Sequence, residues 1–194
     1  MSSHQSTSDK ILLAAIDLMA EKGYDGTTTK EIAAAAGVNE VTLFRHFGSK
    51  QKLLAAAFDR YHYAEEMTKL FRERLTWELE PDLLLISRTY HRLMNRNRKL
   101  IQIALKGGNT LPAEVHERAF RHPQQLKRLL TEYFTAMSER GKVVRSRPEL
   151  QALSFMWMNY GAFVSRLGEE PGSGVTLDDF IEESVMLFVR ALTP

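Results

Sequence analysis

The segment Glu40–Phe47 (EVTLFRHF) combines side chains whose chemistry suits recognition of DNA bases. If this segment is helical, Val41 and Arg45 lie four positions apart on one face, with Thr42 and Phe44 on its flanks. Arginine can donate two hydrogen bonds to a guanine in the major groove, and threonine or valine can contact a thymine methyl group. The segment therefore favours a DNA-reading helix; a plain three-helix bundle with no nucleic-acid role is the alternative.

Two further helices are predicted to position this segment. Ser8 is expected to cap the first, Asp9 lies in its first turn, and Gly23 ends it. Its apolar residues recur at the spacing of one helical face. These residues are Leu12, Ala15, Ile16 and Met19.

The second helix begins at a capping box, in which Thr28 is the N-cap and Glu31 occupies the third helical position. Asn39 is expected to cap the third helix, whose Leu43 and Phe47 face the core. A short helix that follows its predecessor after a turn of about three or four residues containing glycine is typical of a helix-turn-helix motif.

Residues 27–59 (TTTKEIAAAAGVNEVTLFRHFGSKQKLLAAAFD) resemble the DNA-binding domain of the TetR family of bacterial regulators. The matching features are the threonine-rich cap before EIA, the AGV turn, the LFRHF core and the following GSK-x-x-LL. The resemblance spans roughly residues 8–58. It implies an all-α fold with a helix-turn-helix DNA-binding domain at residues 8–54, followed by a ligand-binding and dimerisation domain at residues 55–194.

The resemblance also implies roles for individual residues. Thr28, His46 and Lys50 would contact phosphates, residues 39–45 would face the groove, and Phe44 would pack its ring against the DNA backbone. The predicted DNA-binding set is Thr28, Thr29, Lys30, Asn39, Glu40, Val41, Thr42, Phe44, Arg45, His46 and Lys50.

The start of the third helix departs from the family pattern. The family often carries Ser-Lys or Ser-Arg-Gly there, whereas this chain has Asn39-Glu40-Val41. A carboxylate at Glu40 would repel a phosphate, but it could accept a hydrogen bond from a cytosine amino group or turn away to cap the helix. This departure leaves the family resemblance intact and the operator sequence undefined.

Composition restricts the possible classes of function. The 194 residues carry a formal net charge of +2, and 44% of them are hydrophobic. The absence of cysteine excludes disulfides, a thiolate nucleophile and cysteine-based zinc sites. No apolar run approaches the ~20 residues that span a bilayer, and the polar N-terminus lacks a signal sequence, so we expect a cytoplasmic protein with no membrane partner. The first fifty residues lack the excess of basic residues that is usual for a DNA-binding domain.

The rest of the chain is predicted to be helical, for a total of about nine helices. The helix that follows the DNA-binding segment is expected to be a single long one, and Pro81 is expected to mark a boundary after it. The further expected helices span residues 51–79, 82–107, 112–122, 124–141, 148–168 and 176–192.

The last two predicted helices, at residues 148–168 and 176–192, are apolar around most of their circumference. Such helices are buried on more than one side. In TetR-like proteins the corresponding helices pair with their twins, which implies a homodimer that reads a palindromic operator in double-stranded DNA. A monomer with a large C-terminal core is the alternative.

Methionine and aromatic residues on the middle helices suit an adaptable apolar pocket for a small-molecule effector. The same residues could instead form an ordinary core, and the pocket itself is implied by the resemblance. The candidate pocket residues are Met67, Phe71, Tyr90, Leu93, Met94, Ile103, Phe120, Phe134, Met137 and Trp157.

A cationic run follows one predicted helix. Arg92, Arg96 and Lys99 share one face at helical spacing and could bind an acidic group, although a solvated face is the more common meaning of such a run.

Signals for catalysis are weak. His62 with Glu65 or Glu66 has a spacing that a metal in a helical bundle could use, but two candidate ligands on one helix are poor evidence, and no metal or cofactor is predicted. The sequence has no G-x-S-x-G, P-loop or Rossmann glycine motif.

Three hypotheses follow. The favoured one is a DNA-binding regulator, a repressor released from DNA by a largely apolar ligand. The second is a protein of the same fold that needs no small molecule, and the third is a helical-bundle enzyme or metal protein. The sequence does not identify the ligand or the operator.

Overall fold

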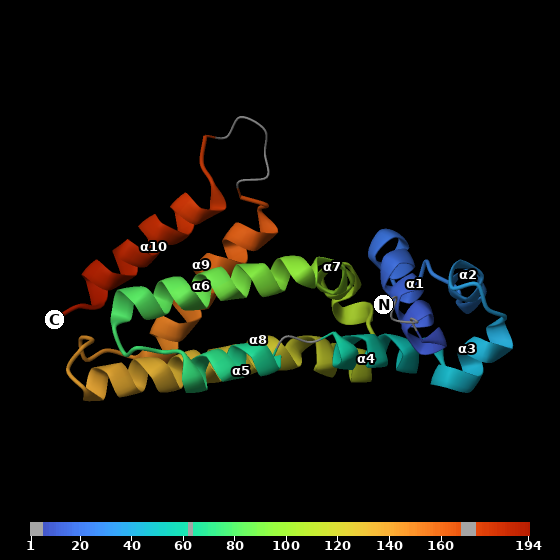
Figure 1. Cartoon of the computed structure of the whole chain (residues 1–194), viewed down its shortest axis with the longest axis horizontal. Coiled ribbons are helices and arrows are strands. Elements are labelled where there is room, and N and C mark those ends of the chain that lie inside the picture. Colours follow the sequence, from blue (N-terminus) through green and yellow to red (C-terminus); the bar gives the residue numbers. More distant parts are fainter. Residues whose placement is uncertain (1–5, 62–63, 168–173) are drawn as a thin grey trace, which may run out of the picture. The chain divides into compact units, whose positions relative to one another are not determined.

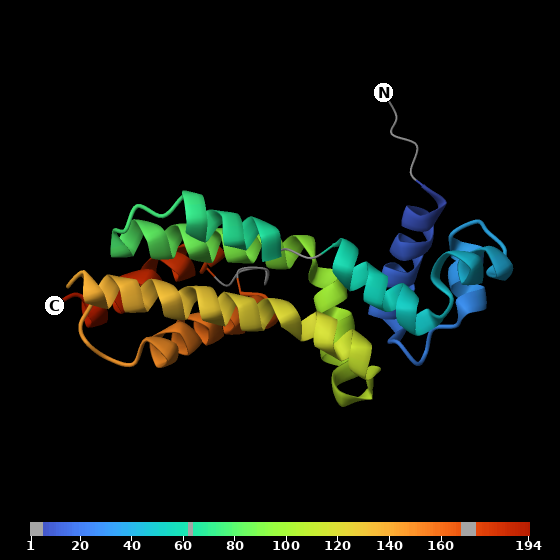
Figure 2. The same ribbon diagram turned by 90° about the horizontal axis from the view of Figure 1, so that it is seen from below.

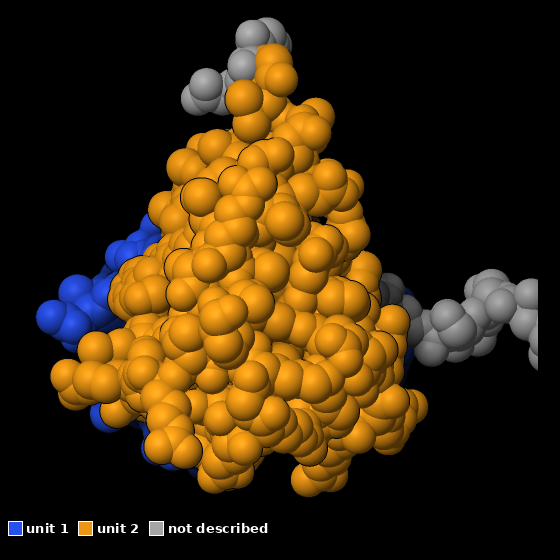
Figure 3. All heavy atoms as spheres, turned by 90° about the vertical axis from the view of Figure 1, so that its left-hand side faces the viewer, with its two compact units in different colours: residues 1–62, 97–122 blue, residues 63–96, 123–194 orange. Residues whose placement is uncertain are grey.

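The computed structural model describes residues 6–61, 64–167 and 174–194, and these residues form helices without any strand. The predicted all-α fold is thereby confirmed. The chain divides into two compact units, residues 1–62 with 97–122 and residues 63–96 with 123–194 (Figure 3). No helix in the described part of the chain is long and apolar enough to cross a membrane.

The first unit contains the N-terminal helices and a later segment. Four helices come from the N-terminal part: α1 (Thr7–Lys22), α2 (Thr29–Ala35), α3 (Glu40–Phe47) and α4 (Lys50–Arg60). The later part contributes α7 (Arg98–Gly107), a 3-10 turn (Gly108–Thr110) and the first ten residues of α8 (Ala113–Glu139).

The core of the first unit forms where α1, α2 and α4 pack together and α7 packs on α1 (Figures 1 and 2). The expected apolar face of α1 is buried, and its Ala15 and Met19 are fully inaccessible to solvent. Leu100 and Ile103 of α7 belong to the same core. The three N-terminal helices therefore rest on a segment from the middle of the chain as well as on one another.

The second unit is built around α6 (Leu79–Arg96), which packs against α5 (Ala64–Glu73), α9 (Pro148–Val164) and α10 (Leu177–Leu192). The rest of α8 completes it. Pro148 occupies the first turn of α9, as expected, and Thr176 forms a capping box with Asp179 at the start of α10.

Several predicted helix boundaries are wrong. Ser6, not Ser8, caps α1, because its hydroxyl accepts the hydrogen bond from the Asp9 amide at 3.1 Å. The predicted helix 51–79 is described as α4, which ends at Arg60, and α5, which ends at Glu73. The predicted end of the eighth helix at residue 168 lies outside the described residues.

Two prolines and an asparagine account for the other differences. Pro81 lies in the first turn of α6, where its missing amide costs little, so it does not mark a boundary. Pro123 lies inside α8, which continues through it, whereas two helices were expected. Asn97 adopts a non-helical conformation and divides the expected helix 82–107 into α6 and α7.

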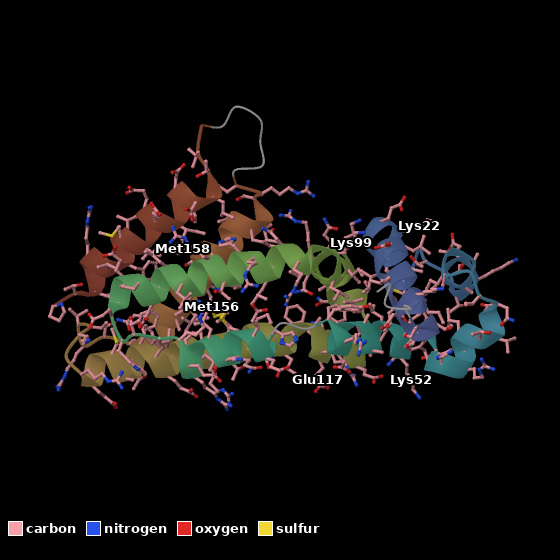
Figure 4. The ribbon with its side chains drawn as sticks, in the orientation of Figure 1. Lys22, Lys52, Lys99, Glu117, Met156 and Met158 are labelled. Carbon is pink, nitrogen blue, oxygen red and sulfur yellow. The ribbon has the colours of Figure 1, made fainter. Side chains whose placement is uncertain are left out.

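The break at Asn97 also divides the cationic run. Arg92 and Arg96 pair with Glu66 of α5, and the guanidinium of Arg92 holds the pKa of that carboxyl below its usual value. Lys99, on α7 of the other unit, forms an ion pair with Asp17 of α1 at 2.7 Å (Figure 4). The expectation that these three cations share one face is therefore wrong, and each has an acidic partner within its own unit.

Candidate DNA-binding interface

The start of α2 is fixed by the predicted capping box. Thr28 Oγ1 accepts a hydrogen bond from the Glu31 amide at 3.2 Å, and Glu31 Oε2 accepts one from the Thr28 amide at 2.9 Å. Lys22, labelled in Figure 4, donates to the same carboxylate at 2.8 Å. This hydrogen bond, together with those from Thr28, lowers the pKa of Glu31 to about 2.

A glycine turn joins α2 to α3. Gly37 has a φ of 69°, a left-handed conformation that other residues rarely adopt. After it, Asn39 Oδ1 accepts hydrogen bonds from both the amide and the hydroxyl of Thr42, each at 2.8 Å. The predicted cap is confirmed, and it orients the first turn of α3.

The two faces of α3 differ as the sequence indicated. Leu43 is fully buried, whereas Val41 is 76% exposed and Phe44 is 44% exposed. Arg45 and His46 are also exposed. The helix packs on the core through Leu43 and the half-buried Phe47, and it exposes an aliphatic group, an aromatic ring and a guanidinium.

Glu40 has an internal partner. Its Oε1 accepts a hydrogen bond from the hydroxyl of Thr29, the first residue of α2, at 2.5 Å. This contact ties the first turn of α3 to the first turn of α2. The sequence suggested that Glu40 contacts a base or caps its own helix, but Asn39 is the cap of α3 and the Glu40 carboxylate bonds to α2.

Lys50 is also engaged within the unit. Its ammonium donates to the carbonyl oxygens of Tyr24 and Thr27, both at 2.9 Å, and lies 4.2 Å from the centre of the Tyr24 ring. These contacts hold the loop between α1 and α2. The neighbouring Lys52 is exposed instead, and its side chain extends outward from α4 (Figure 4).

All eleven residues of the predicted DNA-binding set belong to the first unit, on α2, on α3, at the N-cap positions of these two helices and, for Lys50, at the start of α4. Members of the set make hydrogen bonds within the first unit, namely Thr28 with Glu31, Thr29 with Glu40, Asn39 with Thr42, and Lys50 with the α1–α2 loop. Lys52, which is exposed in the first turn of α4, is not a member of the predicted set.

The N-terminal helices match a family model. Residues 11–57 match the model described as bacterial regulatory proteins of the tetR family. The chain is also 32% identical, over 189 residues, to the HTH-type transcriptional regulator YvkB of Bacillus subtilis, covering 96% of this chain and 97% of that protein. The chain belongs to the TetR family.

Other comparisons agree with this membership. This TetR-family regulator is 22% identical to IcaR of Staphylococcus aureus, named as a negative transcriptional regulator of a biofilm operon, over 94% of this chain and 98% of that protein. Among solved structures, AibR in complex with isovaleryl coenzyme A and operator DNA has a TM-score of 0.75 at 23% identity, covering 94% and 97% of the two chains. NalD of Pseudomonas aeruginosa has a TM-score of 0.72 at 20% identity, with 96% of each chain covered.

In the TetR-family chain the candidate pocket residues are divided between the two units. Ile103 and Phe120 lie in the first unit, and Trp157, on α9, is 64% exposed. Phe71, on α5, is half-buried. The remaining candidates are buried in the second unit: Met67, Tyr90, Leu93, Met94, Phe134 and Met137.

Within the described ranges, no group of three or more histidine, aspartate or glutamate side chains is placed to hold a metal ion. His62, the histidine of the weak sequence candidate, lies outside those ranges.

Proposed function

We propose that this TetR-family transcriptional regulator is a repressor that binds a palindromic operator as a homodimer and leaves it when a small molecule binds the second unit. We infer that its role is binding rather than catalysis, which agrees with the regulators named among its relatives. The DNA-binding residues are proposed to lie on α3 and the positions around it.

The outward face of α3 is the observation that carries this proposal. Val41, Phe44 and Arg45 are exposed on a helix whose ends are held by specific contacts. A helix presented in this way can enter the major groove, where Arg45 would read a guanine and Val41 a thymine methyl group. Because Glu40 is turned onto Thr29, it would not oppose the phosphates directly.

The phosphate contacts would come from exposed groups near α3. His46 and Lys30 are exposed, and Thr28 lies at the start of α2. We assign Lys50 a positioning role, because two carbonyl oxygens already accept hydrogen bonds from its ammonium. Lys52, which is exposed in the first turn of α4, takes the phosphate-binding role that the sequence suggested for Lys50.

An exposed apolar stripe on α9 supports the dimer. Leu150, Trp157 and Val164 lie seven residues apart and are 46%, 64% and 47% exposed. Leu187 of α10 is 64% exposed. We propose that these residues meet their equivalents in a second copy, which would let two α3 helices read half-sites about 34–36 Å apart.

The dimer can be tested with a charged substitution. Trp157→Glu should yield a monomer in sedimentation velocity and abolish binding to the full operator, because a carboxylate at the centre of the interface would be desolvated. Glu183→Gln, an exposed change on α10, is the matched control. A dimer that survives Trp157→Glu would exclude this surface.

Release by an effector requires coupling between the two sites. A ligand that lowers operator affinity by ~1–3 kcal/mol must itself bind less tightly to the operator complex by the same amount. This reciprocity gives a direct check, since the affinity for any inducer can be measured with and without operator DNA. Equal affinities would mean that the protein regulates without that ligand.

The experiment that tests the DNA-binding proposal is a selection of random duplex DNA on the purified full-length protein. We expect a palindrome, bound at least about 10³-fold more tightly than bulk DNA at physiological salt. Scrambled DNA of the same composition is the control. Failure to enrich any sequence over a series of salt concentrations would contradict the proposed repressor function.

A further inference from the structure

A carboxylate links the N-terminal ends of the two helices in the helix-turn-helix. Glu40 is the first residue of α3, and it accepts a hydrogen bond at 2.5 Å from the hydroxyl of Thr29, the first residue of α2. Both side chains are half-buried. The two residues are eleven positions apart in the sequence, so this bond forms only when α2 and α3 pack against each other.

The position of Glu40 on α3 places it at the end of the helix that carries base contacts in helix-turn-helix proteins. In these proteins the N-terminal residues of the second helix reach the base edges, while the first helix crosses the DNA backbone. The Asn39 cap fixes the first turn of α3, and Val41, next to Glu40, is 76% exposed. Glu40 therefore lies beside the side chains proposed to enter the groove.

The carboxylate of Glu40 keeps capacity for further hydrogen bonds. An ionised carboxylate only accepts, and its two oxygens together have about four acceptor positions. The hydroxyl of Thr29 takes one of these positions on Oε1 and restricts the rotation of the carboxyl group. The result is a charged acceptor with a defined orientation at the start of α3.

An acceptor of this kind distinguishes the four bases in the major groove. Guanine presents two acceptors there, and thymine presents an acceptor and a methyl group, so neither can donate to a carboxylate. Adenine has an amino donor beside the N7 acceptor, which repels a negative charge. Cytosine presents its amino donor alone, so it is the base that fits a carboxylate.

A purely structural link between the helices does not require a negative charge. The neutral amide of a glutamine could accept the same hydrogen bond from Thr29, whereas a carboxylate close to DNA is repelled by about one phosphate charge for every ~1.7 Å of the duplex. Glu31, the other acidic residue of the two helices, has Lys22 as its cationic partner. The hydrogen bond to Glu40 comes from a neutral hydroxyl instead. A donor on the DNA would offset the repulsion that Glu40 introduces.

We propose that Glu40 reads a cytosine in the major groove of the operator, and that Thr29 is a positioning residue for its carboxylate. This inference rests on the proposed function and deepens it by specifying one base of the operator. Glu40 precedes Arg45 by five residues, a rise of ~7.5 Å along the helix, so the cytosine and the guanine read by Arg45 are expected within about three base pairs of each other.

The test compares selections of random duplex DNA on the full-length protein and on its Glu40→Gln variant, whose amide can still accept from Thr29. We expect one cytosine in each half-site of the original operator to lose its preference in the variant, because an amide pairs better with adenine. Four duplexes that differ only at this base pair are then titrated. The original protein should prefer cytosine by about tenfold, and the variant by at most about twofold. Identical preferences in both proteins would overturn the proposal.

A second variant controls for the loss of charge. Glu117→Gln removes a carboxylate from an exposed position on α8 in the same unit (Figure 4). Loss of a negative charge should affect all four duplexes alike, because the phosphate backbone is the same in each. Only Glu40→Gln should change their order of affinity. A uniform change in Glu40→Gln would assign Glu40 to helix packing alone and would contradict its reading of a base.

The role of Thr29 is tested with a pair of conservative variants. Thr29→Val keeps the size of the side chain but removes the donor, so the preference for cytosine should fall, and Thr29→Ser should restore it because serine keeps the hydroxyl. Urea unfolding of each variant measures stability separately from base preference. A full preference for cytosine in Thr29→Val would overturn the positioning role of Thr29.

The selection on the original chain separates this inference from the proposed function. Enrichment of a palindrome that is the same for the original protein and for Glu40→Gln would support operator binding and overturn the role of Glu40. Enrichment of no sequence by the original protein would contradict both the repressor and the reading of a base by Glu40.

Discussion

The hydrogen bonds of the α2–α3 segment and those in the interior of the second unit join residues that are separated by different distances in the sequence. Thr28 bonds with Glu31, and Asn39 with Thr42, across three residues. In the second unit Asp82 bonds with Tyr133, 51 residues away. The first region is therefore specified by neighbouring residues, while the second depends on helices that meet only after folding.

This difference corresponds to different tasks. A helix that reads DNA must present its side chains to an external partner in a fixed orientation, and local caps provide that orientation without burying the reading face. A site that encloses a small molecule needs side chains from several helices. We expect perturbations of the second unit to affect stability most, and perturbations of α3 to affect binding.

The largest effect is expected at the long-range contact. Asp82→Ala removes the acceptor for Thr76 and for the buried hydroxyl of Tyr133, and should lower the free energy of unfolding by about 3 kcal/mol. Thr28→Ala, which removes a local cap, should cost about 1 kcal/mol. Denaturation in urea measures both, with the exposed Glu80→Ala as control. A smaller loss of unfolding free energy for Asp82→Ala than for Thr28→Ala would contradict the expectation that the long-range contact stabilises the protein more than the local cap.

The next effect concerns specificity at α3. Arg45→Ala should weaken operator binding by about 1–3 kcal/mol and relax one position of the operator, because a guanidinium that reads a base cannot be replaced by a methyl group. Arg60→Ala, an exposed arginine of α4, is the matched control. Titrations of operator and scrambled DNA distinguish the roles, and equal losses on both would assign Arg45 to phosphate contact alone.

A pair of neighbouring lysines tests positioning against phosphate contact. Lys50→Met should cost about 1 kcal/mol of stability, because the Tyr24 and Thr27 carbonyl oxygens lose their charged donor, and should not change the salt dependence of DNA binding. Lys52→Met should leave stability unchanged and reduce the slope of log K against log salt by about 0.9 per chain. If Lys50→Met reduced the salt slope and Lys52→Met did not, Lys50 rather than Lys52 would be the phosphate-binding residue.

The smallest effect is a pH dependence at the start of α2. The pKa of Glu31 is about 2, so its contribution to stability is present above the ordinary glutamate pKa and is lost as the pH falls towards 2. Glu31→Gln should therefore reduce the loss of stability on acidification between about pH 5 and pH 2. Thermal unfolding at a series of pH values measures this, and Lys22→Met, which removes the main cause of the shift, should act in the same direction.

The sequence predicted much of the first region because its determinants are local. The capping box at Thr28, the cap at Asn39 and the burial of Leu43 follow from spacings of three or four residues. Contacts between residues far apart in the sequence were not predicted. Nothing near Lys50 indicated that its ammonium would reach Tyr24, 26 residues earlier.

The candidate pocket also depends on contacts between residues that are far apart in the sequence. Residue type alone suggested that Trp157, Phe120 and Ile103 belong with Met67 and Leu93, but the fold places Phe120 and Ile103 in the other unit and leaves Trp157 exposed. Hydrophobic and aromatic types suit a core, an interface and a pocket equally well.

The sequence by itself determined that the chain is helical, where α2 and α3 begin and which side of α3 faces outward, because helical periodicity and capping act within one or two turns. Only the tertiary structure decided that Glu40 turns onto Thr29, that α8 continues through Pro123, and that the carboxylate of Asp82 is buried against Tyr133. The packing of helices far apart in the sequence produces these features, and the free energy of packing overrides the preferences of single residues.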